Sequence, residues 1–331
     1  MRKLKYMDAI TEALDEEMQR NDRVFLIGED VGVSGGVWGT SRGLIEKYGP
    51  LRACDTPIAE SAIVGTAVGA ALTGLRPVTE LMYIDFVGCA MDQVVNQAAK
   101  LRLMSGNQFS MPLVIRGPQG CGTMEAAHHS GNLESWFVHT PGLKVVAPFS
   151  VYDVKGLLKT AIREDTPVLF LENRLLYGRI EDVPDTETWL VPFGQAAVRR
   201  EGTNVTIVSY SYMVHKVLEA AQRVAPNISV EVIDLRTLVP LDMKTIVASV
   251  KKTNHVIIAH EAVARCGMGA EITRRVIDEA FDYLDAPPKV VGGASTPMPY
   301  SRSLEEAVVP QVEDVVHAIL EVLDRTSILS A

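Results

Sequence analysis

Short apolar runs alternate, through the first half of the chain, with longer segments in which apolar residues recur at helical spacing. The runs have the length of buried strands, and the segments between them are long enough for helices. The predicted strands cover 24–28, 77–82, 112–117, 143–148 and 167–172. The predicted helices cover 5–20, 58–73, 87–104 and 150–164. This alternation indicates an α/β domain with a mostly parallel sheet.

The alternation stops at 179–192, where RIEDVPDTETWLVP loses its periodicity and gains Asp, Glu and Pro. We expect the linker between two domains in this segment. The pattern then restarts, with predicted strands at 204–211, 228–235 and 255–261 and predicted helices at 213–225, 242–252, 268–284 and 311–324. The sequence therefore predicts a first α/β domain over 1–185 and a second, smaller α/β domain over 195–331.

Composition excludes several classes of protein. A length of 331 residues suits two domains of about 150 residues each. The net charge of −9 argues against a nucleic-acid or anionic-membrane surface, and no apolar run is long enough to span a membrane. The N-terminal segment turns acidic too soon for a signal peptide, and the four cysteines form no CxxC pair. We expect a cytoplasmic protein with free thiols, although a processed organellar protein has the same features.

A glutamate opens a segment that otherwise has no charge. The run from Glu60 to Gly74 consists of apolar and small residues, so the predicted helix has no obvious exposed face. Thr56 is the expected N-cap and Pro57 the expected first residue of this helix. Glu60 either complements the helix dipole or works as a buried proton donor or acceptor, since burying a carboxylate is costly without a partner.

A glycine-rich segment ends in two histidines. RGPQGCGTMEAAHHSGN covers 116–132 and contains His128 and His129. Surface histidines on a mobile loop are one interpretation. The other is a hinged loop that carries a proton-transferring histidine into an active site. No further ligand pattern accompanies the pair, so zinc is disfavoured.

The remaining motifs are less specific. Met82 and Phe86 read as ordinary core residues, and the polar residues of the helix that follows read as surface positions. GEDVGVSGG and GGVWG lack the spacing of dinucleotide- and phosphate-binding loops, and no GxSxG elbow occurs. A NAD-binding dehydrogenase is therefore disfavoured.

Taken together, a series of sequence blocks resembles one family over almost the whole chain. The blocks are IGEDVG, DTPIAE, GLRPVTELM, DQVVNQAAK, HHS, HTPGLKVVAP, KGLLKTAIR, LENRLLYG, GMGAEI and TPMPYSRSLE. They are similar to the beta subunits of the thiamine-diphosphate-dependent decarboxylating component of 2-oxo-acid dehydrogenase complexes. The resemblance implies a pyrimidine-binding domain followed by a transketolase C-terminal-like domain. Pyruvate-type members fit best, and acetoin and branched-chain 2-oxo-acid members are nearly as similar.

The resemblance also implies roles for individual residues. Glu60 matches the glutamate that contacts N1′ of the aminopyrimidine ring of thiamine diphosphate, and Met82 and Phe86 match residues that pack against this ring. His129 matches the active-site histidine, which acts during transfer of the acyl group to a lipoyl group. Family members usually carry glutamine where this chain has His128, so the choice between the two histidines stays open.

Two metal ions follow from the same resemblance. A potassium site, made largely of carbonyl oxygens, falls on Leu113, Ala161, Ile162, Glu164 and Thr166. The family favours Asp and Asn where this chain has Glu164 and Thr166. The GDG motif that holds Mg²⁺ and diphosphate is absent from this chain, so the resemblance implies that an alpha subunit supplies Mg²⁺.

The sequence thus predicts the beta subunit of a 2-oxo-acid dehydrogenase of the pyruvate type. The resemblance implies that it is active only in an α2β2 heterotetramer and that it docks to a lipoyl acyltransferase core. Acetoin and branched-chain 2-oxo-acid dehydrogenases are the enzymatic alternatives. A scaffold subunit that only stabilises an alpha chain is the alternative without catalysis.

Overall fold

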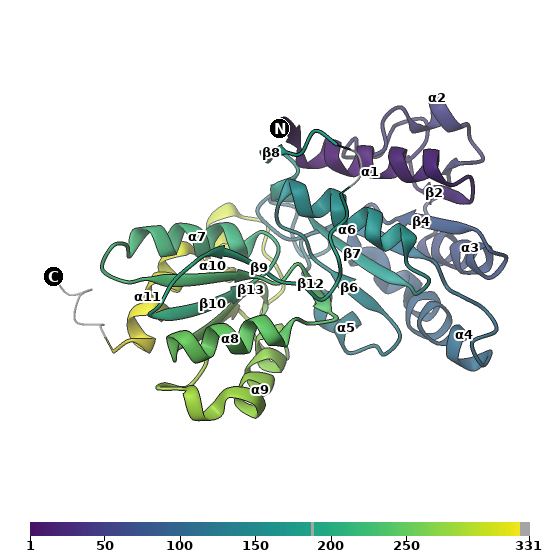
Figure 1. Cartoon of the computed structure of the whole chain (residues 1–331). Helices are drawn as coiled ribbons and strands as arrows, with labels where there is room; N and C mark the ends of the chain where they lie inside the picture. The colour runs from purple at the N-terminus through teal and green to yellow at the C-terminus, as the bar shows by residue number, and fades with distance from the viewer. Residues whose placement is uncertain (187–188, 325–331) are drawn as a thin grey trace. The chain divides into compact units, whose positions relative to one another are not determined.

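The computed structural model describes residues 1–186 and 189–324 and divides into two compact units (Figure 1). Of the described residues, the first unit contains 1–119, 136–186 and 189–193, and the second contains 120–135 and 194–324. Residues 187–188 of the predicted linker lie outside the described residues. The segment 120–135, which carries the two adjacent histidines, therefore belongs to the second unit. The predicted domain limits of 1–185 and 195–331 stay a prediction.

The first unit is built on a parallel sheet, as predicted. Its strands are hydrogen-bonded in the order β6-β7-β5-β4-β2-β3, and each neighbouring pair is parallel. A separate antiparallel pair joins β1 to β8. The strands are β1 (Arg2–Lys5), β2 (Val24–Gly28), β3 (Ala53–Asp55), β4 (Arg76–Glu80), β5 (Val114–Gln119), β6 (Lys144–Val146), β7 (Val168–Asn173) and β8 (Ile180–Val183).

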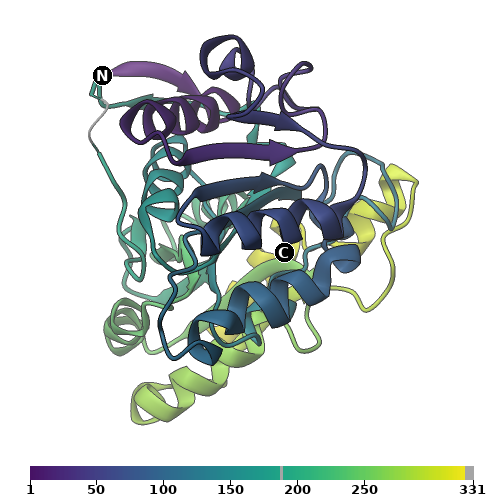
Figure 2. The same cartoon turned by 90° about the vertical axis from the view of Figure 1, so that its right-hand side faces the viewer.

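The helices of the first unit cover this sheet. They are α1 (Tyr6–Arg20), α2 (Leu44–Tyr48), α3 (Glu60–Leu72), α4 (Ala99–Met104) and α6 (Val151–Arg163), and the short α5 (Glu134–Val138) begins in the second unit. Helices α1 and α6 pack against each other, and the buried Lys155 of α6 pairs with Glu12 and Glu16 of α1 at 2.7 and 2.5 Å. Figure 2 shows α3 alongside strands of the sheet, where it contacts β4 and β2.

Helix α3 differs from its prediction in two respects. It begins at Glu60 with Ala59 as the N-cap, and no side chain caps it, so the prediction of Thr56 as the cap is wrong. The prediction of burial on all sides is also wrong for the single chain. Residues at one helical spacing are buried, whereas Ala62, Thr66 and Gly69 are exposed. The exposed face of α3 carries small, uncharged residues, so in the sequence it looks the same as a face of a fully buried helix.

Two other segments differ from the predicted elements. The predicted helix over 87–104 is a 3₁₀ helix (Ile84–Ala90), a π-helix (Gln93–Ala98) and then α4. The predicted linker begins with strand β8, which pairs with β1 from Ile180 to Val183. Apolar spacing predicts a helix over 87–104 but does not separate 3₁₀, π and α turns, and the linker segment lacks the spacing that identifies a strand.

The second unit has its own mainly parallel sheet. The strand order is β14-β13-β10-β11-β9, and only β9 runs antiparallel to its neighbour among these strands. The strands of this unit are β9 (Ala197–Arg200), β10 (Val205–Ser209), β11 (Val230–Asp234), β12 (Thr237–Val239), β13 (Val256–Val263) and β14 (Lys289–Gly293).

Helices lie on both faces of the second sheet (Figure 1). They are α7 (Met213–Arg223), α8 (Met243–Thr253), α9 (Met268–Ala280), α10 (Arg302–Val308) and α11 (Val312–Val322). Helices α7 and α11 pack together, and α8 and α9 form a second pair. The core between the α7–α11 pair and the sheet includes Val217, Val232, Val315 and Ile319. The periodic apolar segments predicted here are confirmed as helices and strands.

Candidate active site

Glu60 lies in the first turn of α3, and its side chain is half-buried. The chain just before it is fixed to the end of β2, because the Thr56 N–H donates to the Gly28 carbonyl at 3.0 Å. The Asp55 carboxylate also accepts hydrogen bonds from the Gly32 and Val33 N–H groups, at 2.5 and 3.0 Å. Glu60 is therefore held near the carboxyl end of a parallel strand, where α/β proteins commonly bind ligands.

A second acid lies close to Glu60. Glu29 directly follows β2, and burial raises its pKa, with further contributions from the charges of Asp30 and Glu60. We did not single out Glu29 from the sequence. Its position directly after a buried strand was the available signal, since ligand-binding residues often occupy such ends.

Met82 and Phe86 follow β4 and are both half-buried. The Leu81 N–H donates to the Arg116 carbonyl at 2.9 Å, which fixes the chain as it leaves the sheet. Phe86 lies on the 3₁₀ helix that packs against α3, and its ring meets the Tyr83 ring edge-on with centroids 6.3 Å apart. The structure thus brings the elements that carry Glu60, Met82 and Phe86 together within one unit.

Gly65 allows close packing beside this group. A Cβ atom added at Gly65 lies 3.3 Å from Oε1 of Gln93, a residue of the π-helix. At Gly69, by contrast, an added Cβ meets no atom within 4 Å. Gly65 therefore allows the Gln93 side chain to pack closely within the chain, whereas the Gly69 side of α3 is open in the single chain.

Below the strand ends lies a buried ionic cluster that we did not recognise in the sequence. Arg116 of β5 pairs with Glu80 of β4 and with Glu172 of β7, and all three side chains are at most 3% exposed. The Tyr177 hydroxyl donates to Glu172 Oε2 at 2.6 Å. The signal was a charged residue within each of three apolar strand segments. Such residues are rarely fully buried unless they are paired.

The two histidines lie in the second unit. His128 is exposed and His129 is half-buried, and the His129 N–H donates to the Ala126 carbonyl at 3.4 Å. The loop has no regular structure between 120 and 133, and Met124 and Ala126 adopt positive φ angles of 58° and 60°. Glu60 and His129 thus belong to different compact units.

The five residues of the predicted potassium site lie at two neighbouring places in the first unit. Ala161 and Ile162 lie in the last turn of α6, and Leu113 precedes β5, where its carbonyl accepts the Val168 N–H at 2.9 Å. The Arg76 guanidinium donates to the carbonyls of Ile162 and Glu164, at 2.9 and 2.5 Å. Carbonyl oxygens are suitable ligands for a hard cation such as potassium. Two of these carbonyls, however, already accept hydrogen bonds from the Arg76 guanidinium.

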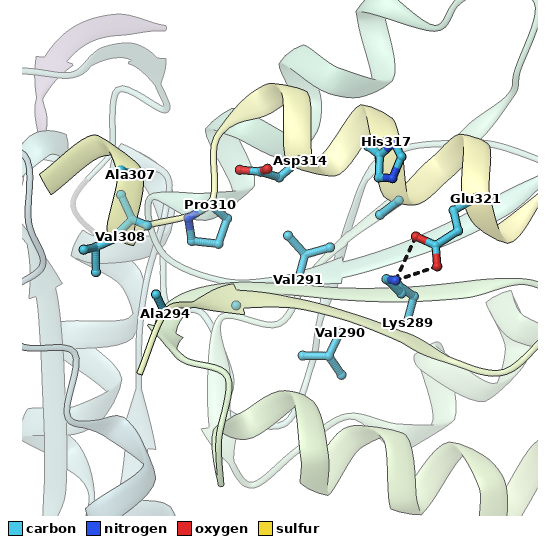
Figure 3. Close-up of a pocket in the computed structure, with 13 residues that line it drawn as sticks. Lys289, Val290, Val291, Ala294, Ala307, Val308, Pro310, Asp314, His317 and Glu321 are labelled. Atoms are coloured by element: carbon cyan, nitrogen blue, oxygen red, sulfur yellow. Dashed lines mark hydrogen bonds and ion pairs between the residues drawn. The ribbon is translucent and has the colours of Figure 1, made fainter. Parts of the chain in front are cut away.

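A cavity of about 340 Å³ lies elsewhere, between β14 and α11 of the second unit (Figure 3). Lys289 at its edge forms an ion pair with Glu321, with distances of 2.6 and 2.8 Å to the two carboxylate oxygens. None of the predicted site residues lines this cavity.

Metal-binding clusters and membrane-spanning helices are both absent from the described part of the chain. No group of three or more His, Cys, Asp or Glu side chains in the described part of the chain is arranged to hold a metal ion. No helix within 1–186 or 189–324 combines the length and apolar character needed to cross a membrane.

Comparison with known proteins defines the class. Residues 2–179 match the transketolase pyrimidine binding domain, and residues 194–315 match the transketolase C-terminal domain. A solved split-gene transketolase, described as an inactive beta4 tetramer, has a TM-score of 0.79 with 24% identity and covers 97% of this chain and 98% of its own. This likeness establishes the fold. The chain is thus a two-domain protein of the transketolase type, and the predicted fold class is confirmed.

Closer relatives define the family. The pyruvate dehydrogenase E1 component subunit beta of Rickettsia conorii is 50% identical over 316 residues, which is 95% of this chain and 97% of that protein. The mitochondrial E1 component subunit beta of Bos taurus is 47% identical over 322 residues, with coverage of 96% and 90%. The chain belongs to the family of pyruvate dehydrogenase E1 component beta subunits. The predicted resemblance is confirmed, and this family membership implies thiamine diphosphate as the cofactor.

Proposed function

We propose that this chain is the beta subunit of a pyruvate dehydrogenase, which carries out thiamine-diphosphate-dependent oxidative decarboxylation and transfers the acyl group to a lipoyl group. The near-full-length identity to pyruvate dehydrogenase E1 beta subunits carries the proposal. It also favours pyruvate over acetoin and branched-chain 2-oxo acids as the substrate.

The residues of the first unit suit one half of a thiamine site. The elements that carry a half-buried carboxyl group, Glu60, and two half-buried apolar side chains, Met82 and Phe86, pack together. When bound, thiamine diphosphate supplies a nucleophilic carbon and an electron sink for the decarboxylation. Glu60 would hydrogen-bond N1′ of the aminopyrimidine and hold or move a proton at that atom. Met82 and Phe86 would pack against the ring and exclude water, which would strengthen the contact of the carboxyl group.

His129 is proposed to hold or donate a proton at the lipoyl acceptor during acyl transfer. Histidine suits this role because its unperturbed pKa is close to neutral pH. The loop of His129 contains glycines and has positive φ angles at Met124 and Ala126. Such rarely populated backbone conformations are common at functional sites, which supports the proposal.

An alpha subunit is proposed to complete the site and to supply Mg²⁺, within an α2β2 heterotetramer. The relatives are named as beta subunits of a component. The exposed face of α3, with Ala62, Thr66 and Gly69, offers a small, uncharged surface on which another backbone can pack closely. The second unit is proposed to dock to the lipoyl acyltransferase core.

The proposed compartment is the cytoplasm, or an organellar matrix after processing, since the relatives include bacterial and mitochondrial proteins. Potassium at Leu113, Ala161, Ile162, Glu164 and Thr166 stays part of the proposal. The carbonyls of Ile162 and Glu164 share their lone pairs with Arg76, so a bound ion competes there with the guanidinium.

Reconstitution tests the proposal directly. We expect 2-oxo-acid-dependent dye reduction when the chain is co-expressed with an alpha subunit from the same organism, with pyruvate preferred over acetoin and branched 2-oxo acids. The chain alone is the control and should be inactive. Full activity of the chain alone contradicts the shared site, and a pair that assembles without activity supports the scaffold alternative.

A further inference from the structure

The loop that carries His129 is closed at its base by its own backbone. The Gly120 N–H donates to the Gly131 carbonyl at 3.0 Å, so the loop leaves and returns at one point. Between these residues there is no helix or strand, and Met124 and Ala126 hold positive φ angles that such residues rarely adopt. A loop of this kind depends for its shape on the side chains that contact it.

A side chain of α10 contacts the loop from within the second unit. Glu305 of α10 is 1% exposed, and its Oε1 accepts the Gly122 N–H at 2.6 Å while Oε2 accepts the Met124 N–H at 3.3 Å. A buried carboxylate is unfavourable unless hydrogen bonds compensate its lost hydration. Backbone N–H groups that converge in a turn make an anion site, and here the protein supplies the anion.

The other end of the loop is fixed as well. The Tyr210 hydroxyl donates to Glu134 Oε1 at 2.5 Å, and the Tyr210 ring stacks on the His260 ring with centroids 6.2 Å apart. Both Tyr210 and Glu134 are buried. His128 and His129 therefore lie, along the chain, between the residues bound by Glu305 and the residue Glu134. Both of these buried carboxylates attach the loop to the rest of the second unit.

We infer that Glu305 is a positioning residue for His129. Its carboxylate fixes the backbone at Gly122 and Met124, and this fixes the path of the chain towards His129. Glu305 touches no reacting atom in this scheme and acts through the loop. The inference rests on the proposed function only for the catalytic consequence. The mechanical part, that Glu305 holds the loop, stands independently.

Amide hydrogen exchange on the full-length chain tests the mechanical part. Glu305→Gln keeps the size of the side chain but replaces one acceptor with an NH₂ group that faces a backbone N–H. We expect exchange in the segment 120–129 to become about tenfold faster, as the loss of a charge-assisted hydrogen bond predicts. The control is Glu306→Gln, on the same helix, where the exposed carboxylate pairs with Arg302 at 3.0 Å. Equal exchange in the two variants overturns the inference.

Kinetics of the reconstituted α2β2 enzyme test the catalytic part. Glu305→Gln should lower transfer to lipoamide about tenfold while sparing decarboxylation with an artificial acceptor. Combined with His129→Ala it should cause no further loss of transfer, because the two residues act through one group. Equal loss in both assays, or additive loss in the double variant, overturns the positioning role.

The two possible failures give different results. If His129→Ala leaves transfer unchanged while exchange still accelerates in Glu305→Gln, the proposed function of His129 fails and the anchoring of the loop stands. If exchange is unchanged while His129→Ala impairs transfer, only the inference on Glu305 fails. Should Glu305→Gln not fold, Glu305→Asp keeps the charge with a shorter reach, and it should give smaller changes in the same direction in both measurements.

Discussion

The guanidinium of Arg116 and the carboxylate of Glu172 form a bidentate ion pair inside the first unit, with Nε–Oε1 at 2.6 Å and Nη2–Oε2 at 2.7 Å. The same guanidinium also contacts Glu80. Burial raises the pKa of Glu80; the charge of Arg116 opposes this shift and that of Glu172 adds to it. The Arg116 cation is thus paired with two buried carboxylates. The cluster includes residues of β4, which leads to Met82, and of β5, which leads to the His129 loop.

Removal of this cation should be strongly destabilising. We expect Arg116→Met to lower the free energy of unfolding by about 3–5 kcal/mol, because two carboxylates stay buried without their partner. Urea denaturation of the full-length chain measures the change. Arg274→Met, which breaks exposed ion pairs with Glu271 and Asp278, is the control and should leave the midpoint unchanged. An Arg116 variant as stable as this control contradicts the assignment of the cluster to the core.

His260 should make the stability of the second unit depend on pH. Burial lowers the pKa of His260 from 6.5 to about 4, and a hydrogen bond with the Ala262 carbonyl opposes this shift. Its folded-state pKa lies below its unfolded value, so the unfolded chain binds the proton first as the pH falls. The stability is fully present above pH 6.5 and is lost as the pH falls towards 4. The loss is about 3 kcal/mol for this group.

The measurement is the unfolding free energy of wild type and His260→Gln between pH 4 and 7. The difference between the two proteins should shift by about 3 kcal/mol in favour of the variant at the acidic end. Ile258→Val, two residues away on β13, removes a buried methylene without changing a titrating group, so its difference from wild type should be constant. A constant difference for His260→Gln shows that His260 does not titrate with folding.

Much of the fold could be predicted because local apolar spacing reports burial. The run Val24–Gly28 was predicted as a strand and is β2, and the segment 150–164 contains α6. Apolar spacing did not predict which face of α3 is exposed, because small residues carry no clear signal of burial. Small residues such as Ala62 and Gly69 are compatible with buried and with exposed faces, and only the three-dimensional structure separates the two.

In the candidate site, the sequence could reveal only residues that stand out from their immediate neighbours in the chain. Glu60 stands out as a lone charge before an apolar helix. Glu305 is an ordinary acid in its helix, and its role depends on a contact with Gly122, 183 residues away. Arg116 pairs with Glu80 and Glu172, which are 36 and 56 residues distant. The Arg116 pairings depend on the order of the strands, and the Glu305 contact depends on how α10 packs; a single sequence specifies neither.

Potassium binding can be tested by stability. If the ion binds the folded chain, the unfolding free energy rises by about 2.7 kcal/mol when its concentration is one hundred times the dissociation constant. We expect a higher thermal midpoint in KCl than in choline chloride at equal ionic strength. Arg76→Gln should increase this response, because the Ile162 and Glu164 carbonyls lose the guanidinium. Identical midpoints in the two salts for both proteins contradict the potassium site.

His129 and His128 form a natural pair for comparison. His129→Ala should reduce transfer to lipoamide about tenfold or more, as expected for loss of a proton-transferring group, and spare decarboxylation with an artificial acceptor. His128→Ala changes the exposed neighbour and should leave both activities near wild type. Both reactions are measured with the reconstituted enzyme. The reverse pattern assigns the role to His128, and equal loss in both assays by His129→Ala assigns a different function to His129.

Glu60→Gln should separate a catalytic role from a structural one. The amide is nearly the same size, and the helix loses one first-turn charge, worth about 0.3–1 kcal/mol. If Glu60 handles a proton at the aminopyrimidine, activity falls about a hundredfold or more while assembly with the alpha subunit stays intact. Initial rates of 2-oxo-acid-dependent dye reduction, with size-exclusion chromatography of the same preparation, measure both effects.

The matched control is Glu46→Gln, because Glu46 is also a first-turn acid, on the exposed side of α2. Both substitutions remove one negative charge near a helix N-terminus, so both should change the unfolding free energy by a similar small amount. Only Glu60→Gln should lose activity. Comparable small effects of the two variants on turnover mean that Glu60 serves the helix dipole alone, and the assignment of its carboxyl group to the cofactor is then wrong.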